Sequence, residues 1–207
     1  MKERAKINMM QGDCMDLMKD KPDNYYDLAI VDPPYRDENQ PTKDMRASGS
    51  MKTIVGRPPK EYWNELYRVT REQIVWGANN FQLPQFKGFV VWKKLTISES
   101  FTMSMAEIAS LSEGLSTVSK IFEYAPQGKI TDPRIHPTQK PVALYKWLLQ
   151  NYAKEGDKIL DTHGGSGSIC IACWDLKFDL DWIEKDAYYY KEAVARVERH
   201  KNQLQMF

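Results

Sequence analysis

The chain has 207 residues, of which 42% are apolar and 28% are charged, and its formal net charge is +1. This length predicts a single domain over residues 1–207, and the composition excludes a disordered or fibrous protein. A membrane span is excluded as well, because no run of about 18 apolar residues occurs. The charged N-terminus lacks an apolar signal segment, so we expect a cytoplasmic protein.

Apolar strand patterns and amphipathic helix patterns alternate along the chain. The predicted strands cover residues 28–31, 73–76, 89–92, 158–160 and 179–183, and the predicted helices cover residues 60–69, 142–152, 168–176 and 187–205. This alternation predicts an α/β fold with a mostly parallel, twisted sheet and helices on both faces. Ligands of such folds bind at the carboxyl ends of the strands, where polar or Gly residues follow here.

Asp32, Pro33, Pro34 and Tyr35 directly follow the first of these strands. The two prolines fix the backbone and remove two N–H donors, so the loop presents the Asp32 carboxylate and the Pro33 carbonyl as acceptors. The exocyclic amine of an aminopurine offers two hydrogens to such acceptors, and Tyr35 offers a flat face to a base. Direct in-line transfer of a methyl group then needs positioning and charge complementarity. A rigid turn without chemistry is the alternative.

Residues 41–59 form the longest stretch without a periodic pattern, and over residues 39–60 five basic side chains stand against one acid, Asp44. The five are Lys43, Arg46, Lys52, Arg57 and Lys60. Because the stretch follows the candidate catalytic loop, it predicts contacts with nucleic-acid phosphates. A solvated loop explains the same composition equally well.

A Gly-rich turn at residues 161–168 lies between an apolar strand and an apolar helix. Its glycines allow a sharp turn and a close approach to a ligand, and Glu184 at the end of the next strand can accept hydrogen bonds from ribose hydroxyls. The dinucleotide fingerprint is incomplete because Cys170 stands where its last Gly would be. A cofactor without a pyrophosphate therefore fits better than a dinucleotide.

Cysteine usage argues against disulfides and metals. Three cysteines, Cys14, Cys170 and Cys173, are too few for a disulfide framework. Cys170 and Cys173 have zinc-like spacing, but no second pair of ligands accompanies them and both fall in an apolar helix. We expect them to be packing residues and predict no metal site.

Three motifs together, in this order, resemble the beta group of amino-methyltransferases that act on DNA, and in particular its small, phage-borne or orphan members. They are Asp32 to Tyr35, then His136-Pro137-Thr138-Gln139-Lys140-Pro141, then the Gly-rich turn, and the likeness extends from Gln11 to the last helix. The resemblance implies a Rossmann-like fold with permuted motif order and S-adenosylmethionine as cofactor. It also implies methylation of N6 of a flipped-out adenine in double-stranded DNA, in a bacterium or a phage-infected cell.

The resemblance also assigns roles to residues. The catalytic set is Asp32, Pro33, Pro34 and Tyr35. The cofactor-binding set is Asp13, Asp32, His136, Thr138, Lys140, Asp161, His163, Gly165, Ser166, Gly167 and Glu184. Lys140 and Thr138 match the segment beside the methionine moiety, and a helix N-cap is an equally good interpretation of Asp13. Lys93 joins the five basic residues above as a predicted DNA contact, and residues 76–81 and 91–94 are expected to wall the base pocket.

The sequence departs from the group at several points. The cofactor loop usually carries Phe where His163 stands and Thr where Ser168 stands. No separate recognition domain is visible, so residues 39–60 and 95–133 are the predicted DNA-recognition insertions. Acidic and basic residues of the small relatives correspond to Glu107 and Arg134. Homodimers are common in the group, which makes one an expectation here.

Other methyl acceptors share this chemistry. N4-cytosine enzymes usually carry Ser where Asp32 stands, so Asp32 favours adenine, with N4-cytosine as the alternative. A catalytically silent partner subunit would have no reason to retain all four residues of the catalytic loop. A C5-cytosine enzyme needs a Cys nucleophile, typically after Pro, and none of the three cysteines follows Pro.

Overall fold

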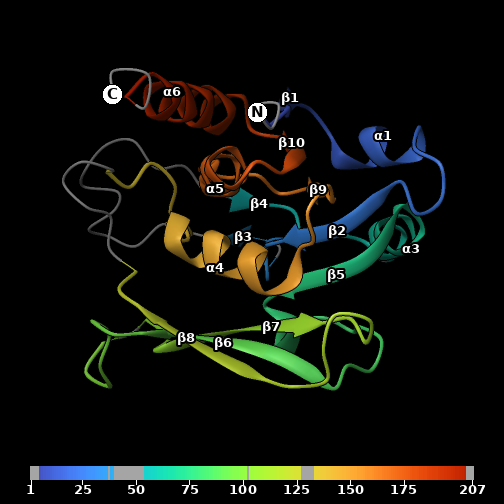
Figure 1. The fold of residues 1–207 in the computed structure, drawn as a ribbon. Coiled ribbons are helices and arrows are strands. Elements are labelled where there is room, and N and C mark those ends of the chain that lie inside the picture. The colour runs from blue at the N-terminus through green and yellow to red at the C-terminus, as the bar shows by residue number, and fades with distance from the viewer. Residues whose placement is uncertain (1–4, 37, 40–53, 102, 127–132, 204–207) are drawn as a thin grey trace.

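A computed structural model describes residues 5–36, 38–39, 54–101, 103–126 and 133–203 as one α/β unit built on an eight-stranded sheet (Figure 1). In spatial order the strands are β1 (Ile7–Gln11), β10 (Asp179–Glu184), β9 (Lys158–Asp161), β2 (Tyr26–Val31), β5 (Thr70–Trp76), β7 (Ala106–Leu111), β6 (Gly88–Lys94) and β8 (Lys120–Tyr124). Only β7 is antiparallel to its neighbours among these strands. The short strands β3 (Glu38–Asn39) and β4 (Ile54–Val55) pair separately.

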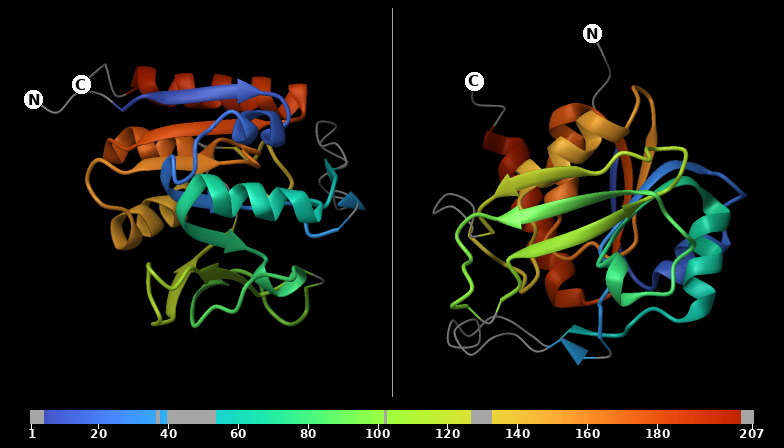
Figure 2. Two further views of the ribbon diagram at one scale, coloured as in Figure 1. Left: turned by 90° about the vertical axis from the view of Figure 1, so that its right-hand side faces the viewer. Right: turned by 90° about the horizontal axis from the view of Figure 1, so that it is seen from below.

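Helices cover both faces of the sheet (Figures 1 and 2). One face carries α4 (Val142–Tyr152), α5 (Ser168–Leu176) and α6 (Ala187–Gln203), which bury Leu148, Ile169 and Val197 in the larger core cluster. The other face carries α1 (Cys14–Lys19) and α3 (Lys60–Val69), which bury Met18 and Leu66 in a second cluster. The predicted fold class is therefore confirmed.

Local sequence explains where the helices begin. Pro59 and Pro141 precede the first residues of α3 and α4, where a missing N–H costs nothing. Helix α5 follows Gly167, whose φ of 70° lies in the left-handed region, so the Gly-rich turn leads directly into an almost entirely buried helix. Cys170 and Cys173 are buried in α5 as free thiols, as predicted for packing residues.

All nine predicted strands and helices are present. Helices 60–69, 142–152 and 168–176 have the predicted bounds, whereas β2 begins two residues earlier and β5 three residues earlier than predicted. Strands β1, β3, β4, β7 and β8 and helix α1 were not predicted.

The segment 95–133, predicted as an insertion, supplies β7 and β8. Strand β7 lies between β5 and β6 in the main sheet, so this part of the segment belongs to the fold itself (Figure 2). DNA contacts by its loops stay a prediction. Of residues 39–60, positions 40–53 lie outside the described residues. None of the described helices is long and apolar enough to cross a membrane.

Candidate active site

A cavity of about 380 Å³ opens at the carboxyl edge of the sheet. Strands β1, β10, β9 and β2 are parallel, so the loops that follow them converge at this edge. The lining residues come from these loops, from the segment before α3, from β7 and from the turn before α4. The predicted residues among them are Asp13, Asp32, Pro33, Pro34, Tyr35, Arg57, His136, Thr138, Lys140, His163, Gly165, Ser166 and Glu184.

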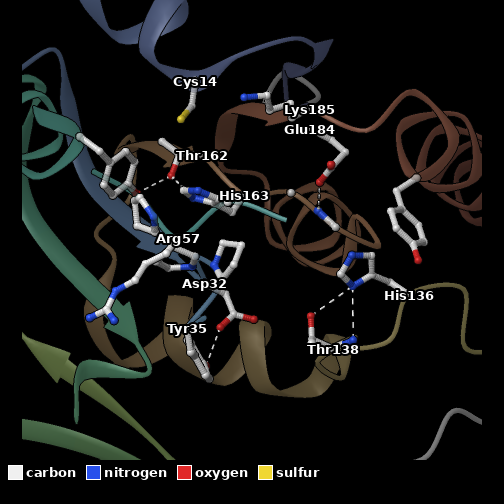
Figure 3. A pocket seen from close by; sticks show the side chains of 18 of the residues that line it. Cys14, Asp32, Tyr35, Arg57, His136, Thr138, Thr162, His163, Glu184 and Lys185 are labelled. Carbon is white, nitrogen blue, oxygen red and sulfur yellow. Dashed lines mark hydrogen bonds between the residues drawn. The ribbon is translucent and has the colours of Figure 1, made fainter. Parts of the chain in front are cut away.

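The catalytic loop leaves β2 with Asp32 at the cavity wall (Figure 3). Tyr35 Oη donates a hydrogen bond to Asp32 Oδ1 at 2.8 Å, and Lys140 Nζ lies 2.5 Å from Asp32 Oδ2. Gly77 makes room for Tyr35, because a Cβ atom at position 77 would lie 2.1 Å from Tyr35 Cε1. The phenol, the carboxylate and the ammonium are thus packed as one unit.

Lys140 bridges two carboxylates from different strands. Its Nζ lies 2.9 Å from Glu107 Oε2 on β7, in addition to its contact with Asp32. The other oxygen of Glu107, Oε1, lies 2.5 Å from Nζ of Lys94 at the end of β6. The network therefore holds two acids and two ammonium groups.

Burial and charge act on this network in opposite directions. Burial raises the pKa of the Asp32 carboxyl, and the Lys140 ammonium opposes that rise. Burial would also raise the pKa of Glu107, but Lys140 and Lys94 together lower it to about 2. The pKa of Lys140 is raised, since the attraction of Asp32 and Glu107 outweighs its burial. Glu107 is therefore ionised, and the contact with Lys140 favours the ionised form of Asp32 against the effect of burial.

The Gly-rich turn and Glu184 form the opposite side of the cavity (Figure 3). The Gly165 N–H donates to Glu184 Oε2 at 2.8 Å, and the Asp186 N–H donates to Glu184 Oε1 at 2.8 Å. A Cβ at Gly164 would lie 2.0 Å from the Trp182 ring, which explains the need for Gly there. Two backbone N–H groups therefore fix the position of the Glu184 carboxylate, which was predicted to accept hydrogen bonds from the ribose.

Asp161 and Gly167 do not line the cavity. Asp161 is buried, accepts the His163 N–H at 3.1 Å, and has its pKa raised to about 8 by burial. Gly167 packs against Ala193 and Val197 of α6. Both residues support the turn from behind.

His136 organises the turn before α4. His136 is buried; its ring packs edge-on against Tyr189, and its Nδ1 lies 3.2 Å from Thr138 Oγ1. Burial lowers the pKa of His136 to about 3, so the imidazole is neutral. The turn presents Thr138 to the cavity and leads Lys140 to Asp32.

His163 stands where the resembling group carries Phe, and it lies centrally in the cavity wall (Figure 3). Its Nδ1 is 2.9 Å from Thr162 Oγ1, which in turn is 2.7 Å from Tyr62 Oη on α3. Burial lowers the pKa of His163 to about 4. The ring is therefore neutral and packs edge-on against Tyr62, as an aromatic side chain would.

Asp13 is the N-cap of α1 and also lies at the cavity, so its predicted role as a cofactor ligand stays a prediction. Its Oδ1 accepts the Met15 N–H at 2.9 Å as the N-cap of α1, and its side chain also lines the cavity. The bond to Met15 and the nearby Lys185 ammonium lower the pKa of Asp13.

Phe81 and Trp63 do not line the cavity, but they pack near Tyr35 and Arg57, which do. Phe81 packs against Tyr35 and Trp63, with ring centroids 6.0 and 5.0 Å apart. Arg57 lies over the Phe81 ring at 5.5 Å and donates to the Asn80 carbonyl. Lys60 is exposed at the start of α3. Lys93 is paired with Glu123, and Lys43, Arg46 and Lys52 lie outside the described residues.

Tyr62 was not predicted as a site residue. Lys94 was expected only as part of the pocket wall at residues 91–94, and Glu107 only as the counterpart of an acid in the small relatives, so their ion pair was not predicted. Glu107 carries a detectable signal, namely an acid inside an otherwise uncharged strand. Lys94 follows Lys93 in the sequence, and nothing distinguishes the two until the strand directs one to solvent and the other inward.

Comparison with known proteins places this geometry in context. Residues 18–195 match the family described as DNA methylase, the N6/N4 methyltransferases. YubD of Escherichia coli (strain K12) is 28% identical over 212 residues, which cover 91% of this chain and 88% of YubD.

Solved structures share the fold. The complex of M1.HpyAVI with SAM has a TM-score of 0.61 at 18% identity, covering 92% of this chain and 98% of that one. The cytosine-N4-specific PvuII DNA methyltransferase has a TM-score of 0.63 at 11% identity, covering 96% and 91% of the two chains.

Proposed function

Because the chain belongs to the DNA methylase family of N6/N4 methyltransferases, we propose that it methylates N6 of adenine in double-stranded DNA. The observation that carries this proposal is the Asp32 carboxylate in the cavity wall, held between Tyr35 Oη and Lys140 Nζ. An ionised acid is an acceptor without a donor, which suits an amine that offers two hydrogens.

S-adenosylmethionine, predicted as the cofactor, is confirmed by the family assignment. The residues present fit it: the cavity of about 380 Å³ lies in the range of small-molecule sites. Gly165 and Glu184 would hold its ribose side, and Thr138 would lie beside its amino-acid end. When bound, the cofactor supplies a methyl group on a positively charged sulfur.

We assign to the catalytic loop the task of holding the target amine. Asp32 and the Pro33 carbonyl accept the two amine hydrogens, which favours a more tetrahedral nitrogen with its lone pair directed at the methyl donor. Tyr35 is partly buried and packs against Gly77 and Phe81, so its ring forms a fixed wall for the base. Rate acceleration then comes from orientation and preorganised charge rather than from a covalent intermediate.

Access to Asp32 requires that the adenine leave the duplex. A base-paired amine is shielded inside the helix, and enzymes that act on such atoms extrude the nucleotide. The cluster of Phe81, Trp63 and the cavity-lining Arg57 supports this, because aromatic and guanidinium planes stack on extruded bases. A 2-aminopurine probe at the target position is expected to brighten on binding. An unchanged signal at saturating protein would contradict extrusion.

DNA contacts are proposed for the basic side chains near the cavity. Arg57 and Lys60 are exposed beside the cavity, and the predicted contacts Lys43, Arg46 and Lys52 precede them in the chain. Lys93 stays a proposed phosphate contact on a neighbouring strand. A homodimer would place two such surfaces on one duplex, and sedimentation with and without DNA tests it.

The central experiment maps the modified base. The protein is incubated with isotopically labelled S-adenosylmethionine and unmethylated genomic DNA, and modified nucleosides are identified by mass spectrometry and sequencing. We expect N6-methyladenine with wild-type protein and none with Asp32→Ala. Detection of N4-methylcytosine alone would show that cytosine, and not adenine, is the methyl acceptor. Absence of any modified base would favour a catalytically silent subunit.

A further inference from the structure

The charge network behind Asp32 extends past the catalytic loop to strands β7 and β6. Lys140 Nζ contacts Asp32 and Glu107 at 2.5 and 2.9 Å, and Lys94 Nζ contacts Glu107 at 2.5 Å. The side chains of Lys140 and Lys94 are only 2% and 6% exposed. Two positive and two negative groups therefore balance one another within the protein.

Burial makes the position of Lys140 important. A buried carboxylate without a partner takes up a proton instead of staying charged, and a protonated Asp32 would lose its full acceptor capacity. Lys140 prevents this only while its ammonium stays on Asp32. That ammonium has three donor hydrogens, and Glu107 accepts one of them. Glu107 lies on β7, which is separated from β2 by β5 in the sheet.

Glu107 is itself held from two sides. Lys94 fixes Oε1, while Oε2 lies within 3.4 Å of Tyr35 Oη as well as near Lys140. The two ammonium groups also lie over aromatic rings, Lys140 over Trp76 at 5.2 Å and Lys94 over Trp92 at 5.1 Å. Each ammonium therefore has both an acid and an aromatic ring as neighbours.

We propose that Glu107 is a positioning residue for methyl transfer: anchored by Lys94, it holds Lys140 on Asp32 and so keeps the catalytic carboxylate ionised and oriented. This inference rests on the proposed function for its catalytic consequence. The simpler alternative is that Glu107 only neutralises the buried Lys94.

Two variants separate these explanations. Glu107→Gln removes the anchor and leaves one positive charge in excess, whereas Glu107→Gln with Lys94→Met removes the pair and restores the balance. We expect the double variant to regain stability lost in the single one, because an uncompensated buried charge is strongly destabilising. Single-turnover methyl transfer should stay about tenfold or more below wild type in both variants, with KM for DNA changed less than about twofold.

The matched control is Glu113→Gln, whose carboxylate pairs with Lys87 on the surface, where both side chains are more than half exposed. It should transfer methyl groups at the wild-type rate. Recovery of the wild-type rate in the double variant would overturn the proposal, since Glu107 would then only neutralise Lys94.

A crystal structure of the double variant tests the positioning without any activity. We expect Lys140 Nζ to lie beyond about 4 Å from both Asp32 oxygens, outside ion-pair range. Retention of the 2.5 Å contact would overturn the proposal. If Lys140 moves but the wild-type protein methylates no DNA, the proposed function fails while the positioning of Lys140 by Glu107 stands.

Discussion

The two ends of the strand order contribute differently to the region around the cavity. At the parallel end, β1, β10, β9 and β2 stop at the cavity edge, and loops with Gly or Pro form the wall. At the other end, β7 and β6 contribute charged side chains of the strands themselves, Glu107 and Lys94. The first end offers backbone shape to a cofactor, and the second fixes charge behind the proposed acceptor site.

Asp32 lies where the two ends meet, and its removal should have the largest effect. Asp32→Ala deletes the acceptor for the amine, and we expect single-turnover methyl transfer to fall about 1000-fold or more, equivalent to about 4 kcal/mol. Cofactor affinity, measured by calorimetry, should change little because the Gly165 and Glu184 side is untouched. Asp16→Asn, an exposed acid on α1, is the control. A near wild-type rate for Asp32→Ala would contradict the assigned mechanism.

Gly77 joins the two ends, because it follows β5 and donates its N–H to the Ile108 carbonyl of β7 at 2.8 Å. In Gly77→Ala the new Cβ would collide with the Tyr35 ring, so Tyr35 must leave Asp32. We expect methyl transfer to fall about tenfold, with about 1–2 kcal/mol of stability lost to the left-handed φ of 69°.

Gly156→Ala supplies the matched comparison for Gly77. Its φ is also positive, at 91°, but nothing lies within 4 Å of the added Cβ. This variant should lose similar stability in denaturant unfolding and keep the wild-type rate. Equal methyl-transfer rates for Gly77→Ala and Gly156→Ala would show that catalysis does not depend on the packing of Tyr35 against position 77.

The contrast between the two ends of the sheet also explains which strands could be predicted from the sequence. Strands such as β2 and β5 end in runs of buried apolar residues and were found from pattern alone. Strand β8 alternates half-buried and exposed residues, and β7 contains Glu107 and Ser110, so neither has an apolar run. Their strand state comes from pairing with neighbours, which a local pattern does not contain.

Site residues likewise fall into those that a short sequence motif locates and those that only tertiary contacts reveal. Asp32, Glu184 and Gly165 stand at fixed offsets from their own strands, so short motifs locate them. Glu107 acquires its role only through Lys140 and Lys94, which reach it from other elements of the fold. The resemblance placed Lys140 beside the cofactor, and the structure adds its contact with Asp32, which only folded geometry reveals.

At the parallel end, buried Arg196 of α6 supports the Gly-rich turn. It donates to the Ser166 carbonyl at 2.8 Å and to Ser168 Oγ at 3.0 Å. Arg196→Met should leave these acceptors unsatisfied, lower stability by about 2 kcal/mol and weaken cofactor affinity about fivefold. Calorimetric titration with S-adenosylmethionine measures this. Arg199→Met, on the exposed face of the same helix, should bind as wild type does. Unchanged affinity in Arg196→Met would show that the turn holds its shape without α6.

The two ends also treat a buried acid differently, and this predicts the smallest effect. At the other end, Lys140 and Lys94 lower the pKa of Glu107 to about 2, whereas at the parallel end burial raises the pKa of Asp161 to about 8. Folded protein therefore holds a proton that the unfolded chain releases near pH 4, so this group makes stability fall as pH rises from about 4 to about 8.

Asp161→Asn removes that dependence while keeping the shape of the protonated acid. Its unfolding free energy, measured by denaturant titration across this pH range, should fall less steeply than that of wild type, by at most about 1.4 kcal/mol per pH unit. Asp179→Asn, an exposed acid at the start of β10, should keep the wild-type slope. Parallel curves for Asp161→Asn and wild type would mean that Asp161 is ionised in the folded protein, and the parallel end would then hold a buried charge as the other end does.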